Sequence, residues 1–426
     1  MCVLSAVAAG GASNTRKEGT YIMTKNERVV IGGVDTHKNV HVAAVIDEHG
    51  KILDTSQFAT TSAGYRQLLA WLRSYGELAK VGIEGTGSYG AGLLRFLASE
   101  GVAVLEVNRP NRQMRRRRGK SDTVDAEAAA RAAMNGDATI VPKSHDSIVE
   151  SIRALRVAFT SARNSRTRVA LQIRDLIVTA PAQLRAEIEP LSTPHRVARC
   201  ARFRPGCPED PREATKLALR VLARRYEALT EEMDELSGVL DELTYKANPA
   251  LRSARGVGVD VAAILLVAAG DNPERLRNES AFAALCGVSP VQASSGLTTR
   301  HRLNRSGNRQ ANNALWRIAV VRITHDEETR AYAARRTAEG KTRREIIRCL
   351  KRHIAREIFA HLTRPQVVPV GTTLRAERNA AKISLTTAST ELGTYPLRIS
   401  RLERGLDHDR EFAEQYQAWL AQKIAA

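Results

Sequence analysis

Residues 29–46 read VVIGGVDTHKNVHVAAVI, two apolar runs separated by a short polar segment that begins at Asp35. The runs Val29–Val34 and Val40–Ile46 have the length and the β-branched content of buried strands. A third run, Ile52–Phe58, follows after a glycine-containing turn. The three runs together predict an antiparallel meander at the start of an α/β domain.

Helices and strands are predicted to alternate through the following part of the chain. The pattern predicts helices at Ser62–Ser74, Gly90–Ser99 and Thr123–Met134, and strands at Lys80–Ile83 and Val102–Val107. Three strands followed by helix, strand, helix, strand and helix is the order of a ribonuclease H-like fold. That fold places three antiparallel strands beside parallel ones, covers both faces with helices, and makes the first and fourth strands neighbours.

Four carboxylates stand at the ends of these predicted elements. Asp35 ends the first strand, Glu84 ends the fourth, and Asp122 and Asp125 open the last helix. In this fold Asp35 and Glu84 would emerge side by side, and the other two would share one face of their helix. Converging carboxylates repel one another unless cations neutralise them, which two magnesium ions about 4 Å apart would do. The alternative interpretation is that Asp122 is the N-cap and Asp125 a first-turn acid, worth about 1 kcal/mol of helix stability, and that Glu84 is an ordinary strand end.

The charge of the chain favours a polyanionic partner. Lysine and arginine outnumber aspartate and glutamate 65 to 46 over 426 residues, a net charge of +19. Each phosphate that a protein neutralises releases condensed counterions, so nucleic acid is favoured over an anionic membrane surface. A basic run directly before Asp122 predicts a nucleic-acid clamp, with a solvated charged loop as the alternative. Its members are Arg115, Arg116, Arg117, Arg118 and Lys120.

Residues 141–247 are predicted to form a linker between two globular units. Leu229, Met233, Leu236 and Leu240 belong to a heptad pattern within residues 212–247, and a similar stripe runs through residues 146–178. Two such helices predict an antiparallel coiled coil. The proline- and arginine-rich segment between them, at about residues 180–211, is predicted to be a loop.

Residues 248–362 are predicted to form a second globular unit, helical and basic. Gly256 and Gly258 form a turn that leads into an apolar helix. Backbone amides of such a turn can hold a phosphate, although a plain connection between helices fits the pattern equally well.

A serine pair lies later in this unit. Ser294 and Ser295 precede Gly296, and a basic stretch follows that contains Arg300, Arg302, Arg305 and Arg309. Serines before a glycine are usually turn residues, and no histidine–acid pair accompanies them. The pattern by itself therefore identifies no nucleophile.

The remaining residues, 363–426, are predicted to form a linker and a small third unit. Helices are expected at Leu385–Leu392 and Pro396–Arg404, with Ile399 and Leu402 facing inward and Arg398, Arg401 and Arg404 facing outward. This pattern is typical of a helix-turn-helix whose second helix enters a DNA major groove. The alternative is a small protein–protein module.

The compartment also follows from the sequence. Residues 1–28 are interpreted as a disordered or non-native extension, because the first convincing strand begins at Val29. The five cysteines are too scattered for a zinc site, which indicates reduced thiols in a cytoplasmic protein. No apolar run reaches the roughly 18 residues of a membrane span, so no membrane association is expected.

Five motifs in this order resemble the insertion-sequence-110 family of transposases: GVDTHK, IEGTG, KSDTVDA, GVSP and SSG, all within residues 29–362. The resemblance implies a RuvC-like domain with an Asp-Glu-Asp-Asp metal site at Asp35, Glu84, Asp122 and Asp125. Two Mg²⁺ ions are expected there, and Mn²⁺ is expected to substitute. The sequence departs from the common family pattern at Leu297 and at Asn312–Asn313.

The resemblance also implies a serine nucleophile in the SSG motif, for which we favour Ser295 over Ser294. In the family the serine forms a covalent link to a DNA phosphate, activated by the metal site of another protomer. The implied partners are double-stranded donor and target DNA, a structured noncoding guide RNA, and further copies of the chain in a dimer or tetramer. Two other functions stay open: a metal-dependent junction-resolving nuclease without a serine intermediate, and a DNA-binding regulator with an inactive nuclease domain.

Overall fold

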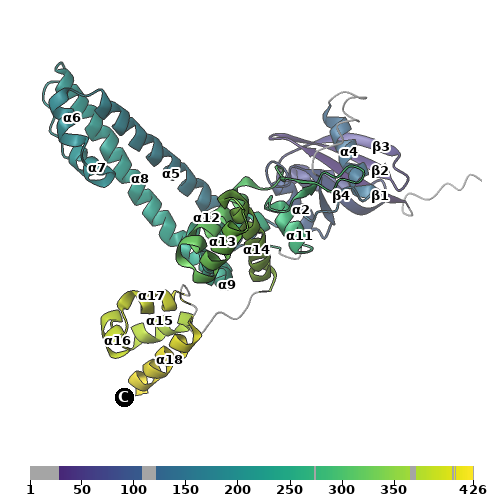
Figure 1. Cartoon of the computed structure of the whole chain (residues 1–426). Coiled ribbons are helices and arrows are strands. Elements are labelled where there is room, and N and C mark those ends of the chain that lie inside the picture. Colours follow the sequence, from purple (N-terminus) through teal and green to yellow (C-terminus); the bar gives the residue numbers. More distant parts are fainter. Residues whose placement is uncertain are drawn as a thin grey trace, which may run out of the picture. The chain divides into compact units, whose positions relative to one another are not determined.

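The computed structural model describes residues 28–107, 121–272, 275–364, 371–404, 407 and 409–425 (Figure 1). The chain divides after Pro142 into two compact units, which we describe separately. The first has a mixed sheet and the second is mostly helical, which confirms the predicted α/β-then-α order. The predicted N-terminal extension, apart from Arg28, and the basic run at residues 115–120 lie outside the described residues. Among the helices described, none is long and apolar enough to cross a membrane.

The sheet of the first unit has five strands in the order β3-β2-β1-β4-β5. These are β1 (Val29–Thr36), β2 (Val40–Asp47), β3 (Ile52–Ala59), β4 (Glu77–Glu84) and β5 (Val104–Val107). Strands β1, β2 and β3 pair antiparallel, whereas β4 pairs parallel with β1 and β5 parallel with β4. The prediction that the first and fourth strands are neighbours is therefore confirmed.

Helices cover both faces of this sheet. The helices α1 (Ser62–Arg73) and α2 (Ala91–Ser99) share one core with the strands, in which Val34 and Val45 meet Leu68 and Leu97. On the other face α4 (Asp122–Met134) contributes a row of alanines, which pack against Ile31 and Ile46.

Two glycines bring α4 directly against the sheet. A Cβ atom at Gly33 would lie 2.2 Å from the carbonyl oxygen of Ala126, and one at Gly82 would lie 2.4 Å from that of Ala129. Such distances are far inside van der Waals contact, so the helix backbone rests on the strand backbone at these two positions. This close approach places the first turn of α4 near the end of β1.

The second unit begins with two long helices, α5 (Ile148–Val178) and α8 (Pro211–Ala247), which pack side by side as an antiparallel pair (Figure 1). The prediction of a loop between these two helices is wrong. That segment contains α6 (Ala182–Ile188) and α7 (Thr193–Ala201), because apolar residues of these helices, Leu184, Ile188, Val197 and Cys200, pack against the ends of α5 and α8.

The next part of this unit is built around α10, α12 and α14. Its helices are α9 (Pro249–Ser253), α10 (Val259–Ala269), α11 (Glu279–Leu285), α12 (Arg309–His325), α13 (Glu327–Ala338) and α14 (Arg343–Thr363). Leu265, Leu315 and Ile358 are fully buried where the three central helices meet. A short ribbon of two strands, β6 (Val291–Gln292) and β7 (His301–Arg302), lies between α11 and α12 in the sequence and was not predicted.

The C-terminal part has four helices, of which the sequence predicted only α16 (Leu385–Glu391) and α17 (Pro396–Glu403). The other two are α15 (Gly371–Ala380) and α18 (Arg410–Ala425). Leu374, Ile399, Tyr416 and Leu420 are fully buried in a core that all four helices share. A buried ion pair closes this core: Arg378 Nε donates to Glu403 Oε1 at 2.6 Å.

Candidate active site

The pairing of β1 with β4 places Asp35 and Glu84 on the same face of the sheet. Gly33 lies opposite Gly82, and Val34 opposite Ile83, in a parallel register. Side chains alternate along a strand, so Asp35 shares a face with Gly33, and Glu84 shares a face with Gly82. Both glycines contact α4. The two carboxylates therefore belong to the face that α4 covers.

The first turn of α4 supplies the other two predicted carboxylates. Asp125 is buried, with 3% of its surface exposed, whereas the Asp122 side chain is half exposed. The N-cap of the helix is Ser121, whose hydroxyl accepts a hydrogen bond from the Val124 amide at 3.4 Å. The alternative interpretation of Asp122 as the N-cap is therefore wrong, because Ser121 already fills that position.

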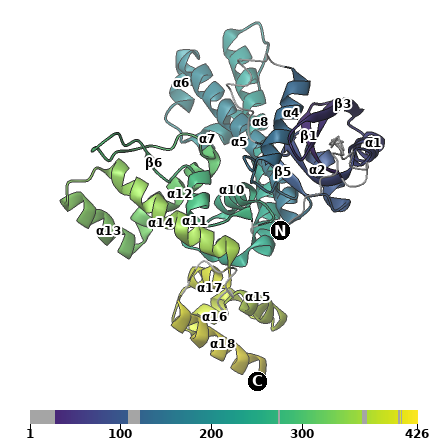
Figure 2. The same cartoon turned by 90° about the vertical axis from the view of Figure 1, so that its right-hand side faces the viewer.

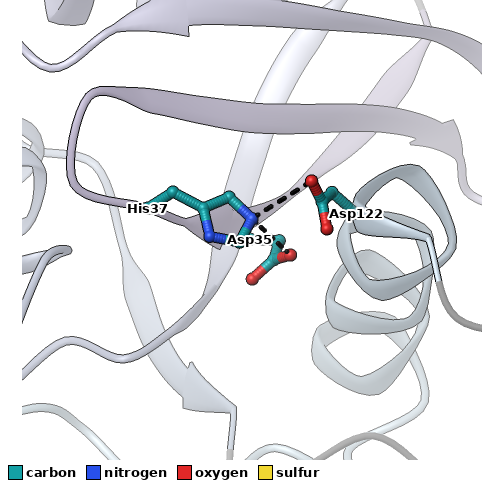
Figure 3. A group of neighbouring side chains, drawn as sticks. All are labelled: Asp35, His37 and Asp122. Atoms are coloured by element: carbon teal, nitrogen blue, oxygen red, sulfur yellow. Dashed lines mark ion pairs between the residues drawn. The ribbon is translucent and has the colours of Figure 1, made fainter.

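A histidine that the sequence analysis did not select lies between two of these carboxylates. The Nε2 atom of His37 is 3.2 Å from Oδ2 of Asp35 and 3.4 Å from Oδ2 of Asp122 (Figure 3). The donor atoms of the three residues all lie within 4.8 Å of one another, close enough to share a metal ion. The signal was present in the sequence, since His37 follows Asp35 by two residues and an extended chain turns such residues to one side.

The surroundings of Asp35 disfavour the ionised form of its carboxyl group. Burial raises the pKa of the Asp35 carboxyl; His37 lowers it, and Asp125 and Asp122 raise it further, with a net upward shift. Asp35 is only 8% exposed, so water screens this repulsion poorly. Binding of a positive ion would remove the repulsion and favour the ionised form.

Glu84 is held at the same edge through its backbone. Thr36 Oγ1, at the end of β1, donates a hydrogen bond to the Glu84 carbonyl oxygen at 2.8 Å, which ties the ends of the two strands together. The Glu84 side chain is half-buried, and it is not part of the compact donor group of Asp35, His37 and Asp122. Of the four predicted carboxylates, the structure thus brings Asp35 and Asp122 within reach of one ion. Asp125 is near enough to raise the pKa of Asp35, and Glu84 lies on the sheet face that α4 covers.

The serine pair lies at the tip of a hairpin in the second unit. Strands β6 and β7 pair through Val291 with Arg302 and through Gln292 with His301. Ser295 and Thr298 exchange backbone hydrogen bonds of 3.1 and 3.0 Å that close the tip. Figure 2 shows the course of this hairpin, which is labelled there at β6. Gly296 adopts a φ of +54° there, a conformation that glycine accommodates without strain.

The two serines differ in their surroundings. The Ser294 hydroxyl bridges the hairpin, since it accepts a hydrogen bond from the Arg300 amide at 3.2 Å and another from Gln292 Nε2 at 3.3 Å. Ser295 is exposed, and within the described residues its hydroxyl has no hydrogen-bond partner. Of the two hydroxyl groups, that of Ser294 is thus the one engaged in hydrogen bonds with described residues.

The described residues that were predicted to contact nucleic acid lie in several parts of the second unit. The four arginines after the serine pair, at positions 300, 302, 305 and 309, are all exposed, and none forms an ion pair with a described residue. Gly256 adopts a φ of +82°, and Gly258 caps α10 without a side-chain hydrogen bond. In the C-terminal part Arg401 is exposed.

Arg398 does not project outward as predicted. It donates to Asp409 Oδ2 at 2.6 Å, and its guanidinium lies 4.0 Å from the centre of the Phe412 ring. The sequence did not predict this because Asp409 and Phe412 belong to the segment around α18, a helix that was missed.

A charge cluster around the half-buried Asp260 in the second unit was also missed. Arg156, Arg163 and Arg317 all donate to the carboxylate of Asp260, in the first turn of α10. Arg156 is 8% exposed and also donates to Gln310 at 2.8 Å. Arg156 and Arg163 are one heptad apart in the sequence, but nothing local indicates that their partner is roughly a hundred residues away.

Comparison with known proteins places both halves of the candidate site in matched segments. Residues 32–180 match the IS110 DEDD family model, described as a transposase, and residues 248–334 match one described as the transposase IS116/IS110/IS902 family. An "Insertion element IS110 uncharacterized 43.6 kDa protein" of Streptomyces coelicolor is 32% identical over 144 residues. That match covers 33% of this chain and 35% of the relative, so it spans about a third of each protein.

Proposed function

The chain belongs to the IS110 family of transposases, and on this premise we propose that it cleaves and rejoins DNA strands to move an insertion sequence. The observation that carries the proposal is the convergence of Asp35, Asp122 and Asp125 at the end of β1. These residues come from opposite ends of the first unit, and their mutual repulsion has no structural benefit. Such an arrangement is typical of a site that binds cations and phosphodiesters.

We propose that the first unit is a RuvC-like, ribonuclease H-like domain over residues 29–140. The strand order, with three antiparallel strands beside parallel ones, and the helices on both faces support this assignment. The antiparallel helices of residues 141–247 would form a coiled-coil linker, and residues 248–362 the domain that carries the nucleophile.

Asp35, Glu84, Asp122 and Asp125 would hold divalent cations, with Mg²⁺ the expected ion. Carboxylate oxygens are the ligands that Mg²⁺ prefers, and Asp35 and Asp122 each offer one within reach of a shared ion. Bound there, such ions would stabilise the negative charge of the phosphodiester and align it for in-line displacement. His37 would help to orient the carboxylates of Asp35 and Asp122, which it contacts.

Ser295 would supply the nucleophile. Its Oγ forms a bond to phosphorus while the bond from phosphorus to one deoxyribose oxygen breaks, and the proton lost by the serine is balanced by one gained by the leaving hydroxyl. The number of phosphoester bonds stays the same, so the reverse attack by a deoxyribose hydroxyl rejoins the strand without ATP. The exposure of Ser295 and the lack of a partner for its hydroxyl within the described residues support this role.

The expected partners are double-stranded DNA, a structured guide RNA and further copies of the chain, whose carboxylates would act on the serine of a neighbouring protomer. The net charge of +19 and the unpaired arginines after the serine pair support nucleic-acid binding. In the C-terminal part we propose a helix-turn-helix DNA-binding role for α16 and α17, supported by the exposure of Arg401 on α17.

Loss of the carboxylates tests this function. Asp35→Asn and Glu84→Gln are expected to lower cleavage of DNA that carries the element ends by at least about a hundredfold, whereas DNA and RNA affinity stay within about twofold. Asp137→Asn, an exposed carboxylate beyond the end of α4, is the matched control. Cleavage at wild-type rates by both site variants would refute the enzymatic proposal and favour a regulator with an inactive nuclease domain.

A further inference from the structure

We call the hairpin of β6 and β7 the serine hairpin, and the segments that flank its strands, residues 287–290 and 303–305, its stems. A cavity of about 520 Å³ lies between these stems and α14. We call it the hairpin cavity. Val288, Pro290 and Leu303 line it from the stems, together with Arg305, while Arg348 and Lys351 line it from α14. Its volume lies within the range of about 300–1,000 Å³ that is usual for small-molecule sites.

The charge of the hairpin cavity is entirely positive. No acidic residue is among the described residues that line it, and the one lining arginine with a carboxylate partner is Arg352, which pairs with Glu279. Within the described residues Arg305, Arg348 and Lys351 form no ion pair, and Lys351 Nζ donates only to the neutral Oδ1 of Asn312, at 2.8 Å. Burial lowers the pKa of the half-buried Lys351 ammonium, and the positive charge of Arg348 lowers it further. Arg305 and Arg348 are exposed to solvent, so the half-buried Lys351 ammonium is the cation whose loss of water most favours the binding of an anion.

Apolar side chains also line the cavity, which points to a particular kind of anion. Val288, Pro290 and Leu303 offer aliphatic surface, and Leu303 is 54% exposed. A simple inorganic anion would leave this surface in water. A nucleotide combines a phosphate with a flat, weakly polar base, so it matches both the cationic and the apolar side chains that line the cavity.

The hairpin cavity is linked to the serine hairpin by hydrogen bonds. Asn312, which accepts from Lys351, donates through Nδ2 to the carbonyl oxygens of Cys286 and Gly287 at 2.8 and 3.1 Å. Cys286 and Gly287 lie where the chain enters the first stem of the hairpin. From Pro290 at the cavity to Ser295 at the tip the chain spans at most about 17 Å. A nucleotide bound in the cavity would therefore lie on the strand near the phosphodiester that Ser295 attacks.

We propose that the hairpin cavity binds one unpaired nucleotide of the nucleic-acid strand that passes the serine hairpin. Arg348 and Lys351 would hold its phosphate, and Val288, Pro290 and Leu303 would contact its base. This inference rests on the proposed function, since it places the nucleotide beside the strand that is cleaved. Occupation of the cavity would fix the stems of the hairpin and so position Ser295.

The test uses the full-length protein and short single strands of DNA and RNA in which one base is 2-aminopurine, with a fully paired DNA duplex for comparison. Wild-type protein is expected to change the 2-aminopurine fluorescence of one of the single strands. Lys351→Gln and Arg348→Gln are each expected to weaken binding of that strand about tenfold. The glutamine at position 351 can still donate to Asn312, which preserves the hairpin.

Arg344→Gln is the matched control, because Arg344 is an exposed arginine one turn earlier on α14 that does not line the hairpin cavity. Whichever strand, DNA or RNA, loses affinity selectively in the two cavity variants is the source of the nucleotide. If neither strand does, or if both variants behave like Arg344→Gln, the proposal is wrong. Binding is measured without cleavage, so Asp35→Asn protein should bind the probe normally even if the proposed catalytic function fails.

Discussion

His37 Nε2 lies 3.2 Å from Oδ2 of Asp35, at the point where β1 ends and the first turn of α4 arrives. The same nitrogen lies 3.4 Å from Asp122, so one side chain contacts carboxylates from both ends of the first unit. The contact depends on the glycine at position 33, which lets α4 approach the strand closely enough for its acidic first turn to meet Asp35.

The close approach of α4 is tested by Gly33→Ala. The added Cβ would lie 2.2 Å from the Ala126 carbonyl oxygen, so the helix must move away from the strand. We expect a loss of about 1–3 kcal/mol in unfolding free energy and a weaker response of thermal stability to Mg²⁺. Gly87→Ala is the control, because a Cβ there has nothing within 4 Å. Equal stabilities for both variants, measured by denaturant unfolding, would show that α4 does not pack as described.

The pH dependence of stability tests the charge balance at Asp35. Its pKa is raised above the ordinary 3.8, so without metal the folded protein binds this proton more tightly than the unfolded chain. The stability of the metal-free protein should therefore fall as the pH rises from about 4 through the raised pKa. Asp35→Asn removes the group whose ionisation costs this stability. In EDTA the variant should therefore have a Tm a few degrees above that of the wild type at neutral pH, and no higher Tm near pH 3.

Addition of Mg²⁺ should reverse the order of the two proteins at neutral pH. The wild-type protein gains stability from the bound ion, whereas Asp35→Asn lacks one ligand and gains less. If the Asp35→Asn protein has a lower Tm than the wild type in EDTA, the Asp35 carboxylate does not destabilise the metal-free protein, and this account of its charge is wrong.

The C-terminal helices make separable predictions for two arginines of α17. Arg401→Ala should weaken DNA binding about tenfold, with little effect on stability, because Arg401 is exposed. Arg398→Ala should instead destabilise the C-terminal core by about 1 kcal/mol, because it removes contacts to Asp409 and Phe412. Gel-shift and thermal-unfolding measurements on both variants distinguish the roles. Unchanged DNA affinity in Arg401→Ala would favour a protein–protein module.

Local pattern was sufficient to predict the sheet and the two long helices. The apolar runs around Asp35 specify the meander, and the heptad that includes Met233 and Leu240 specifies α8, because both signals are short-range. The helices α6 and α7 were not predicted, because prolines and arginines interrupt the apolar pattern of this segment. Its apolar residues, such as Leu184 and Val197, pack against residues elsewhere in the chain.

The candidate site was predicted in its residue types but not in its contacts. Asp35, Asp122 and Asp125 were identified from their positions at the ends of elements. The role of His37 depends on the distance between β1 and α4, which the alanines and glycines of the interface determine only in three dimensions. Likewise, the distinction between Ser294 and Ser295 rests on hydrogen bonds across a hairpin that the sequence did not predict.

The most direct test of the central claim is the covalent protein–DNA adduct on a denaturing gel, measured with DNA that carries the element ends and Mg²⁺. We predict an adduct with the wild-type protein and with Ser294→Ala, and none with Ser295→Ala or Asp35→Asn. Peptide mapping should place the phosphate on Ser295. An adduct that persists in Ser295→Ala would contradict the assigned nucleophile, and strand cleavage without any adduct would favour a junction-resolving nuclease that uses the carboxylates alone.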